Sequence, residues 1–434
     1  MNIADQVYWF RHSAPYINAH RGKTLVLLLG GEVLAHPNLT HIIHDIALLH
    51  SLGVRLVIAF GARPQIDQRL RDAGVEPRFH RGMRVTDEHT MACVHEAVGR
   101  LRHLLEAKLS MGLINSPMHG ANIQVVSGNW LSARPIGVVD GIDLCHTGNV
   151  RKVDAPAIAG MLAANHIVLQ PCVGYSPTGE SFNLSCEDVA SSVAMALQAD
   201  KLIVFGEQAG LLDEQGQLQR ELRVSQAMQR LEQIDDDNAR RSLLALCRAC
   251  QNGVKRAHII SYRADGALLQ ELFTRDGIGS MVTDERYEQI RPATIDDVGG
   301  ILELIRPLEE SGILVRRSRE LLEREIGYFT VDERDGTIVG CAALYPFHEE
   351  RMAELACVAV KNDYRAKGRG DGLLAYIEAK AREQGIEQLF VLTTQTAHWF
   401  IERGFQPASV DALPGQRKQL YNWQRNSKVF VKPL

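Results

Sequence analysis

The chain has 434 residues, a length that predicts two large domains or about three of average size. Its 48 basic and 52 acidic side chains give a net charge of −4, which argues against a general polyanion binder, and 45% hydrophobic residues exclude a disordered chain. The sequence shows no apolar run that could span a bilayer, no signal peptide and no framework of paired cysteines. We therefore expect a cytoplasmic protein that contacts neither membrane nor nucleic acid.

Residues 1–20 predict a helix. Ile3, Val7, Phe10, Ala14 and Ile17 follow one another at intervals of three or four, which lines one helix face. A helix that precedes the first strand has to bury this stripe either on its own domain or on a partner subunit. The sequence leaves both possibilities open.

Apolar runs and helical patterns alternate from residue 24 onward. Short glycine turns separate them, as expected of βαβ units, a largely parallel sheet and helices on both sheet faces. Ligands of such sheets bind beyond the carboxyl ends of the strands, where the glycine turns fall. The predicted strands include 24–31, 54–61, 166–174, 201–207 and 256–262, and the predicted helices include 41–53, 63–74 and 187–199.

Near residue 285 the pattern restarts, and we place a domain boundary between residues 285 and 286. A strand, a Pro-Ala-Thr turn and a helix beginning near Asp296 and Asp297 come first. Two strands joined by an Asp335-Gly336 hairpin turn follow. Later strands are expected at 352–360, 388–394 and 428–434, so both domains belong to the α/β class.

A basic, glycine-rich segment between a strand and a helix is the strongest chemical signal. Residues 365–370 are Arg-Ala-Lys-Gly-Arg-Gly. A loop of this kind exposes backbone N–H groups at a helix N-terminus, which favours a pyrophosphate. The spacing fits neither a P-loop nor a dinucleotide fingerprint, but it resembles the pyrophosphate loop of the GNAT acyltransferases. A plain basic turn is the alternative; the flanking strand and helix and the phrase AHWFIERGF favour the GNAT interpretation. On this resemblance the residues expected to contact acetyl-CoA are Val358, Val360, Arg365, Lys367, Gly368, Arg369, Gly370 and Gly372.

Acetyl transfer to an amine needs a polarised thioester carbonyl, a neutral amine and a protonated leaving thiolate. Backbone N–H groups of Cys357 and Val358 are candidates for holding the carbonyl. Glu354, on the same strand, is the best candidate for taking a proton from the ammonium, directly or through water; a plain surface carboxylate is the alternative. Thr393 ends the next strand, near the expected thiol. Whether it orients groups or transfers a proton stays open, as does the identity of the general acid.

Arginines that lie far apart in the second half of the chain suggest that the molecule that receives the acetyl group is acidic. Arg317 follows the phrase GILV, and Arg425 and Ser427 precede the last strand. A guanidinium binds carboxylates through two parallel hydrogen bonds. Two such groups that converge on one site would suit a dicarboxylate.

Almost the whole chain resembles the bacterial N-acetylglutamate synthases. The similarity rests on phrases such as FGARPQI (60–66), FNLSCEDVASSVA (182–194), LLQELFTRDGIG (268–279), ELACVAV (354–360) and QRNSKV (424–429). It implies an amino acid kinase-like αβα sandwich with a largely parallel sheet over residues 1–285, followed by a GNAT domain with a mixed sheet over 286–434. It also implies acetyl transfer from acetyl-CoA to the α-amino group of L-glutamate, the first step of arginine biosynthesis. The implied glutamate-binding residues are Val315, Arg317, Cys357, Arg425 and Ser427, with Glu354 as the base.

The resemblance implies feedback inhibition by L-arginine through the first domain. Active kinases of this fold begin Lys-x-Gly-Gly, and Leu28 stands in place of that lysine, so we infer that phosphoryl transfer is lost. Glu271 is the candidate for the arginine guanidinium; an ion pair with Arg275 along a helix is its alternative. The implied arginine-binding residues are Leu269, Gln270, Glu271, Gly277, Gly279 and Ser280. The family also implies a homo-oligomer, a hexamer, to which the first helix contributes.

No metal and no permanently bound cofactor are expected, with acetyl-CoA acting as co-substrate. The pair Cys247 and Cys250 lacks the second pair that a structural zinc site needs. Two other functions are alternatives: an active N-acetylglutamate kinase, which Leu28 disfavours, and a non-catalytic arginine-binding regulator, which Glu354 and the basic loop disfavour. Phosphorylation assays and thiol-release assays separate the three.

Overall fold

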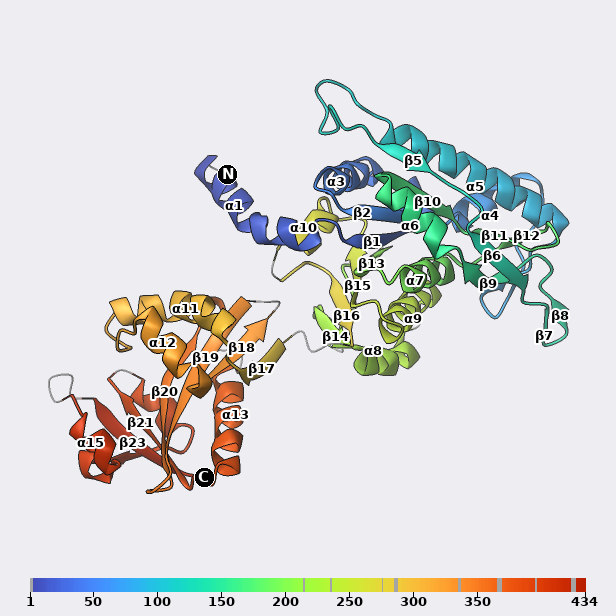
Figure 1. The fold of residues 1–434 in the computed structure, drawn as a ribbon. Coiled ribbons are helices and arrows are strands. Elements are labelled where there is room, and N and C mark those ends of the chain that lie inside the picture. Colours follow the sequence, from blue (N-terminus) through green and yellow to red (C-terminus); the bar gives the residue numbers. More distant parts are fainter. Residues whose placement is uncertain are drawn as a thin grey trace. The chain divides into compact units, whose positions relative to one another are not determined.

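A computed structural model describes residues 3–213, 215–234, 236–274, 276–284, 288–334, 337–364, 369–394, 396–422 and 427–434. It divides into two compact units, residues 1–285 and 286–434, and each is described by itself (Figure 1). The predicted turn at Asp335 and Gly336 lies outside the described residues. Within the described part of the chain, no helix combines the length and hydrophobicity that crossing a bilayer requires.

An eight-stranded sheet forms the centre of the first unit. All its neighbouring strands are parallel except β15 and β16. The order across the sheet is β14 (Glu221–Arg223), β16 (Ser280–Thr283), β15 (Arg256–Ser261), β13 (Lys201–Gly206), β1 (Thr24–Leu29), β2 (Arg55–Phe60), β10 (His166–Pro171) and β5 (Gln124–Val126).

Helices cover both faces of this sheet (Figure 1). Alternate residues of β1 enter opposite cores: Leu25 and Leu27 face one helix layer, and Val26 and Leu28 face the other. The first layer contains α3 (Leu39–Ser51), α4 (Arg63–Asp72), α5 (Glu88–Leu109) and α10 (Ala267–Phe273). The second contains α6 (Ala155–Ala163), α7 (Cys186–Ala196), α8 (Val224–Arg230) and α9 (Asp237–Gln251). The αβα sandwich with a largely parallel sheet is thus confirmed.

Smaller elements complete the first unit. Besides the main sheet, the unit contains a four-stranded sheet and two short two-stranded hairpins. They are β12 (Ser181–Asn183), β11 (Val173–Tyr175), β6 (Leu131–Pro135) and β9 (Gly148–Val153) in sheet order, then β3 (Phe79–His80) with β4 (Met83–Arg84) and β7 (Val138–Val139) with β8 (Ile142–Asp143). The remaining helices are α1 (Ile3–His20), α2 (Gly31–Ala35) and the 3₁₀ turn η1 (Leu231–Gln233).

The predicted first helix is present as α1, and its apolar stripe is only partly covered. Tyr16 and Ile17 pack against the core that α3 and α10 share. Val7 and Phe10 are 43% and 64% exposed within the single chain. Of the stripe, Ile17 is therefore partly buried on its own unit, whereas Val7, Phe10 and Ala14 are exposed.

A seven-stranded mixed sheet forms the second unit, which confirms the predicted GNAT architecture. Only β20 and β21 are parallel neighbours. The order is β17 (Glu288–Pro292), β18 (Phe329–Arg334), β19 (Thr337–Phe347), β20 (Met352–Val360), β21 (Gln388–Thr393), β23 (Lys428–Pro433) and β22 (Gln406–Ala408).

Two helix groups cover the faces of this sheet. One face packs against α11 (Val298–Glu310) and α12 (Arg319–Glu325), and the other against α13 (Arg369–Glu383) and α14 (Ala397–Ile401). The short helix α15 (Gly415–Gln419) lies between Leu413 and Tyr421, which belong to a third cluster with Met352 and Phe390. The 3₁₀ turns are η2 (Ile295–Asp297), η3 (Ile326–Tyr328), η4 (Asn362–Tyr364) and η5 (Val410–Ala412).

Candidate functional sites

Strand β20 carries a bulge at the position expected to hold the thioester carbonyl. Ala359 pairs with Cys341 and Ala356 with Ala343, so that Cys357 and Val358 together oppose one residue of β19. Cys357 has a φ of +52°, a left-handed conformation that is strained for a side chain with a Cβ. A strained bulge of this kind re-aims backbone groups next to functional sites.

The parallel strands β20 and β21 diverge beyond Glu354. Their ladder pairs only Met352 to Glu354 with the start of β21. The backbone N–H groups of Cys357 and Val358 therefore lie outside this ladder. The opening between the two strands begins directly after Glu354, which places the candidate base at its edge.

Glu354 is held by Arg417, a partner that no sequence pattern indicates. Its side chain is only 11% exposed, and it accepts hydrogen bonds from Arg417 Nε to Oε2 at 2.5 Å and from Arg417 Nη2 to Oε1 at 3.0 Å. Both carboxylate oxygens are thus engaged by one guanidinium on α15. Because 63 positions separate the two residues, no local sequence pattern relates them.

Arg317 lies close to the bulge. Burial opposes the charge of its guanidinium, yet Cys357, Tyr345 and Glu325 nearby raise the Arg317 pKa. Tyr345 donates its phenolic hydrogen to Glu325 Oε2 at 2.7 Å, and burial raises the Tyr345 pKa. The structure therefore brings Arg317 and Cys357 together, as a shared acceptor site requires.

The other residues predicted to bind the acceptor, or to lie near the thiol, contact different parts of the second unit. Val315 is 58% exposed, and its carbonyl accepts a hydrogen bond from Arg317 Nη1 at 3.2 Å. The carbonyl of Ser427 accepts one from the Tyr421 hydroxyl at 2.6 Å. Thr393 ends β21, and its Oγ1 accepts the N–H of Thr396 at 3.1 Å. Arg425 lies outside the described residues.

The predicted pyrophosphate loop is described only from its C-terminal end. Arg365, Lys367 and Gly368 lie outside the described residues. Arg369 begins α13, but its side chain is 9% exposed and pairs with Asp332 at 3.0 Å. Its guanidinium therefore compensates the charge of Asp332, and its contact with acetyl-CoA stays a prediction.

The two glycines of α13 are also explained by packing. A Cβ on Gly370 would lie 2.8 Å from Trp399 Cζ2, and one on Gly372 would lie 3.3 Å from Ile290 Cδ1. At Gly370 this contact is closer than a side chain tolerates, so Trp399 requires glycine there whether or not a ligand is bound. The sequence motif alone does not separate these two causes.

Glu271, predicted to bind arginine, is buried and hydrogen-bonded through both carboxylate oxygens. Its side chain is 5% exposed; His258 Nδ1 donates to its Oε1 at 2.7 Å, and the N–H groups of Ile278 and Gly279 donate to its Oε2 at 2.8 Å each. Burial raises the Glu271 pKa, but these hydrogen bonds outweigh it and lower the pKa to about 2. The proposed ion-pair partner Arg275 lies outside the described residues.

Neighbouring residues of this segment hold the backbone in place. Ser280 Oγ donates to the Gln219 carbonyl at 2.6 Å, and Gln270 Nε2 donates to the Asp265 carbonyl at 3.2 Å. Gly277 has a φ of +57°, and a Cβ on Gly279 would lie 2.1 Å from the Ile259 carbonyl oxygen. Leu269 packs against the core. A left-handed backbone therefore accounts for Gly277, and close backbone approach accounts for Gly279.

His258 should make the stability of the first unit pH-dependent. Burial lowers its pKa to about 4 from an ordinary 6.5. The folded state thus binds fewer protons than the unfolded state between these values, and the free energy of unfolding should fall by about 3 kcal/mol as pH drops through this window. His258→Asn, which keeps a hydrogen-bond donor for Glu271, should flatten the slope. Denaturant titrations from pH 7 to 4 test this, and parallel curves for both proteins would contradict it.

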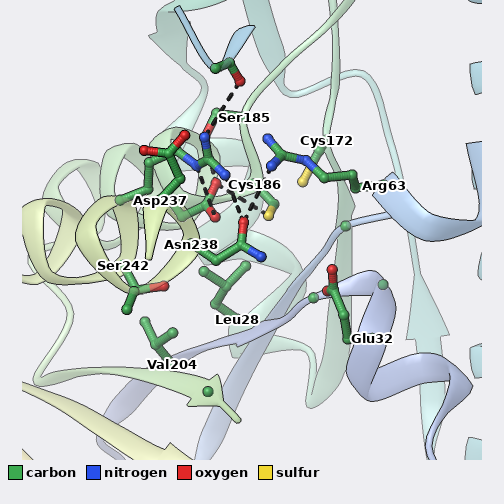
Figure 2. A pocket seen from close by; sticks show the side chains of 18 of the residues that line it. Leu28, Glu32, Arg63, Cys172, Ser185, Cys186, Val204, Asp237, Asn238 and Ser242 are labelled. Carbon is green, nitrogen blue, oxygen red and sulfur yellow. Dashed lines mark hydrogen bonds and ion pairs between the residues drawn. The ribbon is translucent and has the colours of Figure 1, made fainter. Parts of the chain in front are cut away.

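A cavity of about 380 Å³ opens at the carboxyl ends of β1, β2, β10 and β13 (Figure 2). Leu28 forms part of its wall together with Gly30 and Gly31. Arg63 and Arg241 both donate to Asn238 Oδ1, at 3.2 and 2.6 Å. None of the described lining residues is a lysine. In the part of the chain that the structure describes, no group of three or more His, Cys, Asp or Glu residues could hold a metal ion.

Comparisons with known proteins agree with both folds. Residues 23–261 match the amino acid kinase family, and residues 300–405 match the acetyltransferase (GNAT) family. An amino-acid acetyltransferase of Azotobacter vinelandii is 59% identical over 432 residues and covers 100% of both chains. One of Ectopseudomonas mendocina is 57% identical over 430 residues, which cover 99% of this chain and 100% of the relative.

Solved structures give the same assignment. N-acetylglutamate synthase from Neisseria gonorrhoeae, complexed with coenzyme A and L-arginine, is 42% identical with a TM-score of 0.92 and 99% coverage of both chains. A structure of the same enzyme with coenzyme A and N-acetyl-glutamate aligns over the same share with a TM-score of 0.64. The chain belongs to the family of bacterial amino-acid acetyltransferases that includes the N-acetylglutamate synthases, and it is an acetyltransferase.

Proposed function

We propose that this acetyltransferase transfers the acetyl group of acetyl-CoA to the α-amino group of L-glutamate, the first step of arginine biosynthesis, and that L-arginine inhibits it. The observation that carries the proposal is the similarity over 99% of the chain to an N-acetylglutamate synthase whose complexes contain coenzyme A, L-arginine and N-acetyl-glutamate. The bulged β20 supports it, because it offers backbone N–H groups beside a buried carboxylate.

In this proposal acetyl-CoA enters between β20 and β21. Backbone N–H groups of Cys357 and Val358 polarise the thioester carbonyl, since donors held rigidly by the bulge stabilise charge that develops on the oxygen. The main chain at Val360 and the first turn of α13, with Gly370 and Gly372, contact the pantetheine and pyrophosphate.

Glutamate lies on the α11 and α12 face of the sheet in this mechanism. Arg317, Arg425 and Ser427 bind its carboxylates, with the main chain at Val315 and Cys357 beside them. Glu354 takes a proton from the ammonium so that the free amine attacks the carbonyl. Thr393, at the end of β21, orients the groups near the sulfur of the leaving thiol.

We place arginine binding at α10 and the residues that follow it, with Glu271 as partner of the guanidinium. The cavity at the carboxyl ends of the strands supports the loss of phosphoryl transfer, because the apolar Leu28 lies where a kinase needs a lysine charge. All eight cysteines are free, which supports a reducing, cytoplasmic location.

Thiol release from acetyl-CoA tests the proposed function. We expect release that depends on L-glutamate and exceeds release with any other amino acid in a panel, and we expect added L-arginine to suppress it. Acetylation without a preference for glutamate would contradict the substrate assignment. ATP-dependent phosphorylation of N-acetylglutamate would contradict the loss of kinase activity.

We also propose a homo-oligomer, a hexamer by family similarity, in which α1 contributes to subunit contacts. Val7 and Phe10 support this, since both are apolar and exposed in the single chain. Phe10→Asp should shift the molecular mass in sedimentation analysis to a smaller species, while Phe79→Asp, at another exposed phenylalanine of the unit, should leave it unchanged. An unchanged mass for Phe10→Asp would contradict this role of α1.

A further inference from the structure

The ion pair between Arg417 and Glu354 has a direct chemical consequence for a base. Both oxygens of the Glu354 carboxylate accept hydrogen bonds from one guanidinium, which has no acceptor capacity of its own. A substrate ammonium can use the lone pairs that face Arg417 only if at least one of these bonds is given up. In this structure the guanidinium therefore occupies one acceptor position on each oxygen of the candidate base.

Charge balance adds a second obstacle. The Arg417 side chain is 24% exposed, and among the described residues no other carboxylate lies within ion-pair distance of it. Protonation of Glu354 would leave this guanidinium half-buried without a counter-ion, which is unfavourable. Glu354 can work as a base only when another anion takes its place beside Arg417.

The position of Arg417 indicates which anion can do so. Glu354 lies directly opposite Tyr345 on β19, so both side chains are on the sheet face that Arg317 also approaches. Arg317 comes from the segment before α12, and Arg417 comes from α15. Two guanidinium groups from separate elements thus reach one face, where the proposed acceptor brings two carboxylates.

We propose that Arg417 is a positioning residue that couples the release of Glu354 to an acidic acceptor. The side-chain carboxylate of the acceptor pairs with the Arg417 guanidinium and leaves Glu354 ionised and free. Glu354 then takes a proton from the α-ammonium group, and the amine nitrogen forms its bond to the acetyl carbon. As the carbon–sulfur bond breaks, the proton lost from that nitrogen goes to the thiolate, and Glu354 returns its own proton to solvent.

Selectivity between acceptors follows from this coupling. L-glutamine has the length and shape of L-glutamate but no side-chain charge, so it cannot replace Glu354 beside Arg417. It should therefore be a poor acceptor because Glu354 stays paired with Arg417, and not only because it binds weakly. This inference rests on the proposed function and adds to it a residue that determines specificity.

The test is the ratio of kcat/KM for L-glutamate to that for L-glutamine at saturating acetyl-CoA. Arg417→Gln should lower this ratio at least about tenfold compared with the unmodified enzyme, in part through a higher kcat with L-glutamine. Arg417→Lys keeps the charge and should retain most of the ratio. Arg351→Gln removes an exposed ion pair with Glu387 in the same unit and should leave the ratio unchanged.

Two results would overturn the proposal. One is an equal loss of activity with both acceptors in Arg417→Gln, which would indicate a purely structural contact. The other is a loss of the ratio in Arg417→Lys of about tenfold or more; because this variant keeps the charge, its result decides the matter even if the Gln variant fails to fold. An unmodified enzyme without glutamate-dependent thiol release would instead refute the proposed function, so the two failures are distinguishable.

Discussion

Glu354→Gln should lower kcat for glutamate acetylation by about two to four orders of magnitude, the range expected when a general base is removed. The amide keeps the size of the carboxylate and one acceptor for Arg417 but cannot take a proton from an ammonium. KM for acetyl-CoA should change little, because Glu354 lies at the edge of the opening between β20 and β21. Steady-state thiol release at saturating substrates measures both constants.

The matched control is Glu387→Gln, which removes the carboxylate of the exposed pair with Arg351 and should leave kcat unchanged. The Gln variant at 354 also removes half of a buried ion pair, so thermal unfolding has to show that the protein remains folded. A folded Glu354→Gln enzyme with nearly the original kcat would rule out Glu354 as the base.

Glu271→Gln should raise the L-arginine concentration for half inhibition by about ten- to a hundredfold while uninhibited turnover stays largely intact. A hydrogen bond between charged partners contributes about 1.5–3 kcal/mol, which corresponds to that range. The carboxylate is ionised, since hydrogen bonds from His258, Gly279 and Ile278 keep its pKa near 2 despite burial. It therefore presents a full charge to a guanidinium at neutral pH.

Inhibition curves with increasing arginine give the half-inhibition values, and the arginine-dependent rise in melting temperature reports binding independently. Glu207→Gln, which removes an exposed partner of Arg263 in the same unit, serves as the control. If Glu271→Gln keeps both the original inhibition and the original melting shift, arginine does not bind at this carboxylate.

The fold could be predicted from the sequence because its signals are local. Buried strands such as β1 and β2 are continuous apolar runs that end at glycines. The hydrophobic pattern and the glycine turns were therefore sufficient to predict these strands. The bulge at Cys357 could be anticipated only through family resemblance. A positive φ on a cysteine has no sequence signature.

The contacts that define the charge of the sites could not be predicted, because they join distant parts of the chain. Arg369, at the start of α13, pairs with Asp332 on β18, so part of the positive charge expected at the pyrophosphate loop is compensated. His258 meets Glu271 from β15, and Arg417 meets Glu354 from α15. Such pairs depend on register and on how short helices pack, and neither can be read from local spacing.

The extra residue in β20 also changes the phase of the strand. In a regular strand, residues three apart point to opposite faces, yet Glu354 and Cys357 both lie on the α11 and α12 side. The bulge shifts the alternation by one position between them. Deleting a single residue at 357 or 358 would restore regular pairing and keep Ala359 opposite Cys341, but it would remove the bulge that sets the backbone N–H groups of the proposed site. The length of this strand, counted in single residues, is therefore as much a requirement of the site as the identity of its side chains.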